Sequence, residues 1–156
     1  MNRKLGIVDV FSGCGGFALG AELAGMKSLV AVDIDPNLQS SYAINFPESR
    51  PILADVASLD RSAWRLLLKG QRPDGVIGGP PCQGFSRIGK RNKADPRNSL
   101  ISSFFDQVEM LDPNFFVLEN VEGLLDEGTK DVLTTAMEKV AGRFNVLDPV
   151  VVNAAD

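Results

Sequence analysis

The sequence predicts an α/β fold built around a mostly parallel β-sheet. Short apolar runs rich in β-branched residues alternate with stretches of helical period along the whole chain. Strands that alternate with helices favour right-handed βαβ crossovers, which produce parallel strands. The sequence contains no repeat, low-complexity tract or linker. Residues 1–156 are therefore expected to form a single domain.

Six apolar runs are expected to be strands. They cover residues 5–11, 28–32, 51–54, 74–78, 115–118 and 145–152. The first is nearly continuous, as expected for a strand that is buried on both faces. The last lies four residues from the end of the sequence, with no helix after it.

Five helices are expected between the strands, over residues 17–24, 36–45, 61–69, 100–111 and 133–140. Asp35 before Pro36 is a typical helix start, because the carboxylate caps the first N–H groups and proline fits the first helical position. Asp60 can cap the third helix in the same way. Gly25 and Gly70 are typical helix stops.

The composition is that of an ordinary globular protein, with 44% hydrophobic and 23% charged residues. No apolar run approaches the length of about 20 residues that a membrane span needs, and no signal peptide is visible. The two cysteines, Cys14 and Cys82, lie far apart in glycine-rich turns, which suggests reduced thiols in a cytosolic setting. The chain has no histidine, and two cysteines alone provide too few ligands for a structural zinc site, so no metal is expected.

A glycine-rich turn, residues 11–16, follows the first expected strand. Glycines allow a tight turn and let backbone N–H groups approach a ligand closely. Asp33 follows the second strand, 20 residues after Gly13, where a Rossmann-type site places its ribose-binding carboxylate. Asp55, after the third strand, is a further ligand candidate. The cofactor stays open at this point, because residues 13–18 also satisfy the dinucleotide fingerprint and a purely structural turn is an alternative.

The most specific motif is the run Gly-Gly-Pro-Pro-Cys-Gln-Gly-Phe-Ser at residues 78–86. The prolines leave the backbone few conformations before Cys82, so a stiff main chain aims the cysteine. Because the chain has no histidine, a Cys–His pair cannot activate Cys82. A cysteine without its own base needs an electrophile that the protein activates from the far side. A carboxylic acid at Glu119 could do this.

Residues 87–97 form a basic segment in a chain whose net charge is −4. The segment has one acid, Asp95, and five basic residues, which are Arg87, Lys90, Arg91, Lys93 and Arg97. A solvated loop is one interpretation. The position of the segment directly after Cys82 favours contact with a phosphate backbone.

Together these motifs resemble the N-terminal part of the catalytic domain of the DNA (cytosine-5)-methyltransferase family, over essentially the whole chain. The matching pieces are Phe11-Ser12-Gly13-Cys14-Gly15-Gly16, Asp33, Asp55, the Pro-Pro-Cys-Gln-Gly-Phe-Ser run at 80–86 and Glu119-Asn120-Val121. The resemblance implies the Rossmann-like fold of S-adenosylmethionine-dependent methyltransferases. It also implies methyl transfer to carbon 5 of cytosine in DNA, as in restriction–modification systems.

The resemblance implies a role for each site residue. The binding site for S-adenosylmethionine, and for the product S-adenosylhomocysteine, would comprise Phe11, Ser12, Gly13, Gly15, Gly16, Asp33, Ile34, Asp55, Val56 and Pro80. The catalytic set would be Pro81, Cys82, Glu119 and Asn120. Double-stranded DNA with a flipped cytosine would contact the basic segment, Gln83 and Ser86. By the family mechanism, the Cys82 thiolate adds to carbon 6 of cytosine while Glu119 supplies a proton to ring nitrogen 3.

The resemblance also shows what these 156 residues do not contain. Residues 153–156 resemble a segment that in the family runs into a Gln-x-Arg-x-Arg motif, which is absent here. The family's target-recognition region and the C-terminal segment that completes the cofactor pocket are also absent. In the family sheet a later strand lies between the fifth and sixth strands, so the resemblance implies a sheet that is incomplete at the C-terminus, with residues 145–152 at an exposed edge. We therefore expect the chain to be inactive alone, and to be either a truncation or one subunit with a complementary C-terminal partner.

Three alternatives remain open. The first is the RNA-methylating branch of the same family, although Gly84-Phe85-Ser86 favours the DNA branch. The second is a non-catalytic nucleotide-binding or regulatory protein. The third is an NAD-dependent oxidoreductase, which would leave Cys82 and Glu119 unexplained. In the favoured interpretation the protein works in the bacterial cytoplasm or at the nucleoid, on a DNA sequence that the chain does not reveal.

Overall fold

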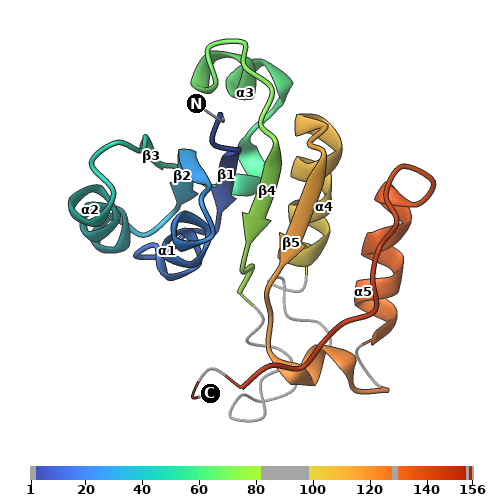
Figure 1. Cartoon of the computed structure of the whole chain (residues 1–156). Coiled ribbons are helices and arrows are strands. Elements are labelled where there is room, and N and C mark those ends of the chain that lie inside the picture. The colour runs from blue at the N-terminus through green and yellow to red at the C-terminus, as the bar shows by residue number, and fades with distance from the viewer. Residues whose placement is uncertain (1–2, 82–98, 128–129, 154, 156) are drawn as a thin grey trace.

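The computed structural model describes residues 3–81, 99–127, 130–153 and 155. The described part contains five strands, which are β1 (Gly6–Val10), β2 (Lys27–Asp33), β3 (Pro51–Leu53), β4 (Gly75–Gly78) and β5 (Phe115–Leu118). All pairings are parallel, and the strand order is β3-β2-β1-β4-β5. Figure 1 shows this sheet with helices packed around it. The prediction of an α/β fold with a parallel sheet is confirmed.

Five α-helices connect the strands, and they are α1 (Gly16–Leu23), α2 (Pro36–Asn45), α3 (Arg61–Leu67), α4 (Ser99–Leu111) and α5 (Lys130–Met137). Short 3₁₀ turns follow β3, β5 and α5 at Val56–Ser58, Glu122–Leu125 and Glu138–Val140. Both predicted caps are present. The Asp35 carboxylate accepts from the N–H of Asn37 at 2.8 Å, and that of Asp60 accepts from the N–H of Ala63 at 2.8 Å.

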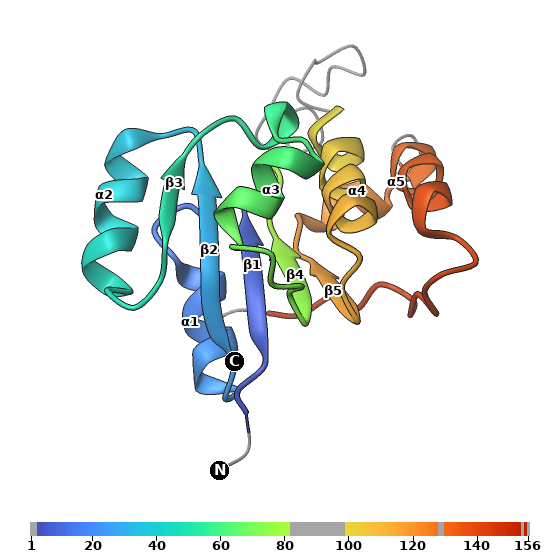
Figure 2. The same cartoon turned by 90° about the horizontal axis from the view of Figure 1, so that it is seen from above.

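The helices form two layers, one on each face of the sheet (Figure 2). Side chains of β1 alternate between the layers, because successive residues of a strand point to opposite faces. Val8 and Val10 belong to the larger core cluster, which contains side chains of α3, α4 and α5. Ile7 packs with side chains of α1 on the other face, and α2 joins α1 there over β2. By the same alternation Asp9 is directed toward the α1–α2 layer.

The strand expected over residues 145–152 does not form. These residues carry no strand assignment, and the described sheet ends at β5. Leu147, Val150 and Val152 are 80%, 80% and 81% exposed. The run has the β-branched composition of a strand, but that preference reflects packing and pairing, and this segment finds no neighbouring strand among the described residues. The prediction from composition was therefore wrong.

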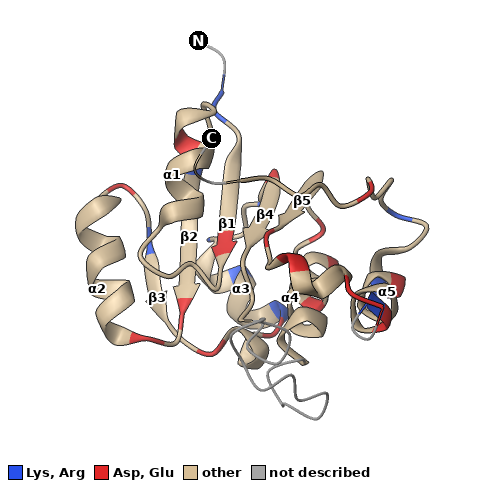
Figure 3. Cartoon of the chain, turned by 90° about the horizontal axis from the view of Figure 1, so that it is seen from below, with Lys and Arg blue, Asp and Glu red and all other residues tan. Residues whose placement is uncertain are grey.

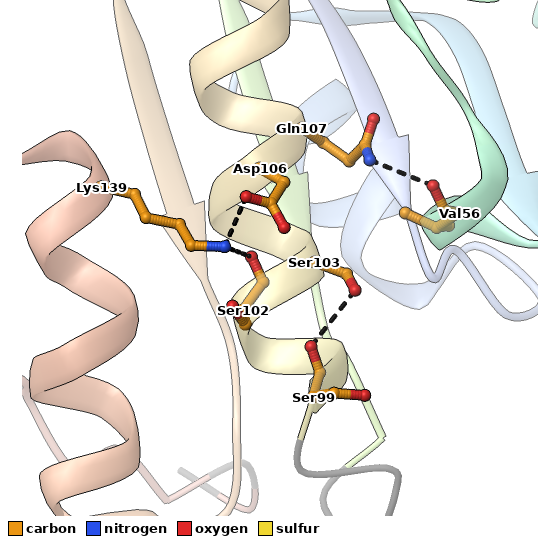
Figure 4. Close-up of polar contacts among 7 residues, drawn as sticks. All are labelled: Val56, Ser99, Ser102, Ser103, Asp106, Gln107 and Lys139. Carbon is orange, nitrogen blue, oxygen red and sulfur yellow. Dashed lines mark hydrogen bonds and ion pairs between the residues drawn. The ribbon is translucent and has the colours of Figure 1, made fainter.

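A buried polar contact joins three elements of the larger core cluster. Gln107 of α4 is 1% exposed, and its Oε1 accepts a hydrogen bond from Trp64 Nε1 of α3 at 2.6 Å. Its Nε2 donates to the carbonyl of Val56 at 3.1 Å, as Figure 4 shows. On the other side of α4, Lys139 pairs with Asp106 (Figure 4). Gln107 therefore fixes the turn after β3 against the helical layer.

Replacing Gln107 by alanine is expected to lower the free energy of unfolding by about 2–3 kcal/mol. The change leaves the Trp64 N–H and the Val56 carbonyl buried without a partner and removes buried volume. Urea denaturation measures the loss. The matched control is Glu109→Ala, an exposed position on the same helix, which should change stability by no more than about 0.5 kcal/mol. Equal losses in both variants would contradict the assigned role.

Candidate active site

The predicted site residues lie at the carboxyl ends of neighbouring parallel strands. The glycine-rich turn follows β1, Asp33 ends β2, Gly79 follows β4 and Glu119 follows β5. Figure 3 shows an acidic stretch within β1 beside the acidic end of β2. In open parallel sheets, ligands bind at this edge, where the strand order changes direction. Here that point is β1, with β2 on one side and β4 on the other.

The glycine-rich turn needs glycine at Gly15 for two reasons. Its φ is +97°, in a region that other residues rarely adopt, and a Cβ there would lie 2.1 Å from the Phe46 ring. Gly13 also has a positive φ, of +54°, but a Cβ at Gly13 or Gly16 would meet no atom within 4 Å among the described residues. One side of the turn is thus packed against Phe46, directly after α2, while Gly13 and Gly16 border open space among the described residues.

Asp33 holds the turn in place. Its Oδ2 accepts a hydrogen bond from the Gly13 N–H at 2.8 Å, and its Oδ1 accepts from the Asp35 N–H at 2.9 Å. The N–H of Ser12 also donates to the Val32 carbonyl, at 3.1 Å. Each carboxylate oxygen has more than one acceptor site, so Asp33 can still accept hydroxyl donors from a ligand. The structure brings the turn and Asp33 together, as the 20-residue spacing predicts.

The other predicted cofactor residues differ in accessibility. Ile34 is 69% exposed directly after Asp33. Asp55 is exposed two residues after β3, and its Oδ1 accepts from the Ala57 N–H at 2.9 Å. Phe11 is half-buried, with a φ of +57°. The Val56 side chain is 2% exposed in the core, so only the backbone of this residue could face a ligand.

Glu119 and Asn120 lie against the segment that leads to Cys82. The Glu119 N–H donates to the Gly78 carbonyl at 3.0 Å, and a Cβ on Gly79 would lie 2.8 Å from Glu119 Oε2. Asn120 Nδ2 donates to the Pro80 carbonyl at 2.9 Å. Pro80 is buried. These contacts join the ends of β4 and β5, and Asn120 in particular fixes the main chain two residues before Cys82.

The remaining predicted residues lie outside the described part of the chain, except for the exposed Pro81. They are Cys82, Gln83, Ser86, Arg87, Lys90, Arg91, Lys93 and Arg97. In the described ranges, 3–81, 99–127 and 130–153, no group of three or more His, Cys, Asp or Glu side chains could hold a metal ion. None of the helices described is long and apolar enough to cross a membrane.

Comparison with known proteins identifies the family. The sequence model of the family described as C-5 cytosine-specific DNA methylase matches residues 5–156. The chain belongs to this family. The resemblance seen in the motifs is thereby confirmed over almost the full sequence.

Three curated relatives of the chain are type II methyltransferases. M.DdeI of Desulfomicrobium norvegicum is 38% identical over 97% of this chain and 37% of its own length. M.XorII of Xanthomonas oryzae pv. oryzae is 41% identical over 100% of the chain and 38% of its own length. M.AquIA of Picosynechococcus sp. is 35% identical over 100% of the chain and 66% of its own length. The chain thus spans under half the length of the first two.

Two solved structures resemble the fold. One carries the description of a DNA modification methyltransferase encoded within a prophage of E. coli, with a TM-score of 0.85 and 40% identity over 94% of this chain and 40% of that one. The other is a mutant of Spodoptera frugiperda DNMT2, with a TM-score of 0.63 and 26% identity over 87% of this chain and 41% of that one. The chain therefore has the Rossmann-like α/β fold of a DNA methyltransferase.

Asp9 is a functional candidate that the sequence motifs did not single out. It lies in the middle of the sheet, paired with Ala31 of β2 and Ile77 of β4, and it is 1% exposed. Burial, and to a smaller extent the nearby Asp33 carboxylate, raises the pKa of Asp9 to about 8. The available signal in the sequence was an acid inside an otherwise apolar strand. Buried acids with raised pKa values are enriched at functional sites.

Replacing Gly15 by alanine is expected to destabilise the fold by more than about 2 kcal/mol. The added Cβ meets the Phe46 ring and also requires a strained positive φ. Gly16→Ala is the matched control, because its Cβ meets open space at the first residue of α1. Thermal unfolding of both variants measures the difference. A Gly15→Ala variant as stable as Gly16→Ala would show that Phe46 does not hold the turn.

The Asp9→Asn variant is expected to be more stable than the parent protein, by a difference in the free energy of unfolding that grows as pH rises from 5 to 8. The folded pKa of Asp9, about 8, lies above the ordinary value of 3.8, so the folded state keeps a proton that the unfolded chain loses. Stability that depends on this proton is present below the unfolded pKa and is lost as pH rises toward 8. The neutral amide removes this dependence. Denaturant unfolding at pH 5, 6.5 and 8 measures it.

The control for Asp9→Asn is Glu48→Gln, which makes the same carboxylate-to-amide change at an exposed position. Parallel pH profiles for the parent and Asp9→Asn would contradict a protonated Asp9.

Proposed function

We propose that this chain supplies the cofactor-binding and nucleophile-bearing part of a DNA (cytosine-5)-methyltransferase of the restriction–modification type. The observation that carries the proposal is the contact between the ends of β4 and β5. Asn120 lies against Pro80 and Glu119 against Gly79, two and three residues before Cys82, in a chain of this family. A nucleophile and an acid from two neighbouring strands are what attack on a pyrimidine ring requires.

S-adenosylmethionine is the proposed cofactor, and the described residues suit it. The open space beside Gly13 and Gly16 can admit the methionine end of the molecule close to backbone N–H groups. In this proposal Asp33 accepts the ribose hydroxyls, and Ile34 and Asp55, both exposed, contact the adenine. When bound, the cofactor supplies an electrophilic methyl group and leaves as S-adenosylhomocysteine. Phe11, Ser12, Val56 and Pro80 complete the proposed site.

The proposed chemistry is covalent catalysis on cytosine. The Cys82 thiolate forms a bond to carbon 6 while the Glu119 carboxylic acid gives a proton to ring nitrogen 3. The electron pair displaced from the carbon 5–carbon 6 double bond makes carbon 5 nucleophilic, ready for the methyl group that the bound cofactor would supply. Loss of the carbon 5 proton to a base then expels the Cys82 thiolate and restores the double bond, and ring nitrogen 3 returns its proton to Glu119. Asn120 and Pro81 act by orienting the main chain that carries Cys82.

Double-stranded DNA is the proposed substrate, with the cytosine flipped out of the helix, because Cys82 cannot reach carbon 6 inside a base stack. Gln83, Ser86 and the five cations of the basic segment are the proposed contacts. The family description and the type II relatives favour DNA over the RNA alternative. The proposal places the protein in the bacterial cytoplasm, where its substrate lies.

Residues 1–156 are proposed to be one cofactor-binding domain that needs the remainder of the family's catalytic unit. The relatives are longer than the matched region, which supports this requirement. The remainder can be supplied by the same polypeptide or by a complementary subunit. The match covers 66% of M.AquIA but under 40% of M.DdeI and M.XorII, so M.AquIA has a much shorter segment outside the matched region than these two relatives.

The catalytic proposal predicts that residues 1–156 are inactive alone and gain activity when a C-terminal portion from a relative is supplied in trans. In that complex Cys82→Ala should abolish methylation, and Glu119→Gln should slow it by about 10²–10⁴-fold, because an amide is no acid. Transfer of a radiolabelled methyl group to DNA measures both. DNA containing 5-fluorocytosine should trap a covalent adduct, because carbon 5 then has no removable proton.

Cys14→Ala is the control for this experiment, since Cys14 is the other cysteine and lies exposed in the glycine-rich turn. It should leave adduct formation in place. Peptide mapping that located the adduct on Cys14, or full activity of Cys82→Ala, would refute the proposed mechanism.

The DNA proposal predicts weak, sequence-indifferent binding that falls steeply with salt. Alanine at Arg87, Lys90, Arg91, Lys93 and Arg97 should remove most of it, because non-specific affinity depends on phosphate contacts. Fluorescence anisotropy with a duplex oligonucleotide at 50 and 200 mM salt measures the effect. Five alanines at exposed cations outside this segment, Lys27, Arg50, Arg65, Lys69 and Lys130, form the matched control. Equal losses in both variants would mean that net charge alone is responsible.

A further inference from the structure

Three side-chain oxygens are buried without a hydrogen-bond donor among the residues that the structure describes. They are both carboxyl oxygens of Asp9 and Oε1 of Gln39, in side chains that are 1% and 6% exposed. Native proteins rarely leave buried polar atoms unpaired, because each costs free energy. The three oxygens therefore need a structural or functional explanation.

These oxygens lie beneath the proposed cofactor turn. Asp9 precedes the turn in β1, and Gln39 of α2 donates from Nε2 to Ser12 Oγ, inside the turn, at 2.9 Å. Asp33 interacts electrostatically with Asp9 and itself accepts from the Gly13 N–H. One carboxyl group is thus buried next to a second one that already holds the turn.

No cation compensates this charge within the described surroundings. The charged or titratable groups that face Asp9 are Asp33 of β2 and Tyr42 of α2, and Glu22 of α1 faces Tyr42 in turn. β4, on the other side of β1, has no titratable side chain. Tyr42 is neutral near pH 7, as a tyrosine ordinarily is, and burial raises its pKa further, to about 12. The surroundings of Asp9 thus favour its neutral form until a positive charge arrives.

We propose that Asp9 is the counter-charge for a cationic cofactor: it is protonated in the free protein and releases its proton to solvent when S-adenosylmethionine binds at the glycine-rich turn. Asp9 thereby makes the site prefer the positively charged sulfonium to the neutral thioether product. The inference rests on the proposed function, since it assigns a specificity role within the same cofactor site.

The size of the effect follows from electrostatics. A unit positive charge about 10 Å away, at an effective dielectric constant of about 20, lowers a carboxyl pKa by about one unit. From a starting pKa of about 8, such a change releases about half a proton at pH 7.5. By linkage, affinity for the cation rises as pH increases through this range, because the ionised form binds it better.

Calorimetric titration at pH 7.5 in phosphate and in Tris tests this, because the difference in heat gives the number of protons released. S-adenosylmethionine should release about half a proton, and S-adenosylhomocysteine, which lacks the sulfonium charge, less than about one tenth. The affinity for S-adenosylmethionine should rise about fivefold to tenfold between pH 6.5 and 9, and that for the product should stay constant.

Asp9→Asn should abolish both the proton release and the pH dependence, while Glu22→Gln, a carboxylate-to-amide change at an exposed position of α1, should keep them. If Asp9→Asn does not fold, ¹³C NMR of the parent protein's Asp carboxyl groups gives the pKa of Asp9 with and without each ligand. A shift with S-adenosylmethionine alone supports the proposal.

The outcomes separate the two proposals. Binding of S-adenosylmethionine without proton release, or equal release with both ligands, overturns the role of Asp9 and leaves the methyltransferase proposal standing. Failure of millimolar S-adenosylmethionine to bind overturns the proposed cofactor, and the role of Asp9 with it.

Discussion

The burial of β1 in the centre of the parallel sheet is the constraint on which the rest of the described structure depends. β1 pairs with β2 on one edge and β4 on the other, and helices cover both of its faces. Every side chain of β1 is therefore buried. Because successive side chains point to opposite faces of the sheet, β1 contributes to the core on both faces. Val8 and Val10 join the α3–α4–α5 layer, whereas Ile7 joins α1. Because β1 is paired on both edges and covered on both faces, it fixes the position at which the glycine-rich turn after Val10 begins.

The site inherits its geometry from this arrangement through backbone contacts. The Gly13 N–H meets Asp33, the Glu119 N–H meets the Gly78 carbonyl, and the Asn120 amide meets the Pro80 carbonyl. Each contact joins the carboxyl ends of two adjacent strands. Groups positioned by rigid elements hold a reactive geometry better than groups on independent loops. The same edge of the sheet can therefore serve both cofactor binding and the proposed chemistry.

Two features of the structure, the buried Asp9 and the exposed apolar side chains of residues 145–152, are unfavourable for stability. A hydrophobic side chain at Asp9 would suit the strand better than a buried acid whose oxygens have no donor among the described residues. The exposed apolar side chains of Leu147, Val150 and Val152 are a second departure from the usual pattern. Real proteins break such local rules mainly where function or a further contact compensates. Asp9 lies beside the proposed cofactor turn, and the run 145–152 lies beyond the last paired strand.

Much of the fold and part of the site were readable from the sequence, because their signals are local. Asp35-Pro36 and Asp60 start helices through contacts within a single turn, and the run 115–118 is a strand in both sequence and structure. The spacing between Gly13 and Asp33 follows from one βαβ unit, and the structure brings the two residues into contact. The function was indicated by short motifs that need no tertiary information, above all the residues around Cys82.

Tertiary structure decided what depends on neighbours distant in sequence. The run 145–152 has a strand's composition but no strand beside it among the described residues, and β-pairing requires a partner. Gly15 is fixed by Phe46, and Gln107 joins Trp64 to Val56, through contacts that no local pattern encodes. Asp9 reads in sequence as a single acid that interrupts an apolar run. Only the packing of β2, β4 and two helices around it removes water from its carboxyl group, and that desolvation gives it an unusual pKa.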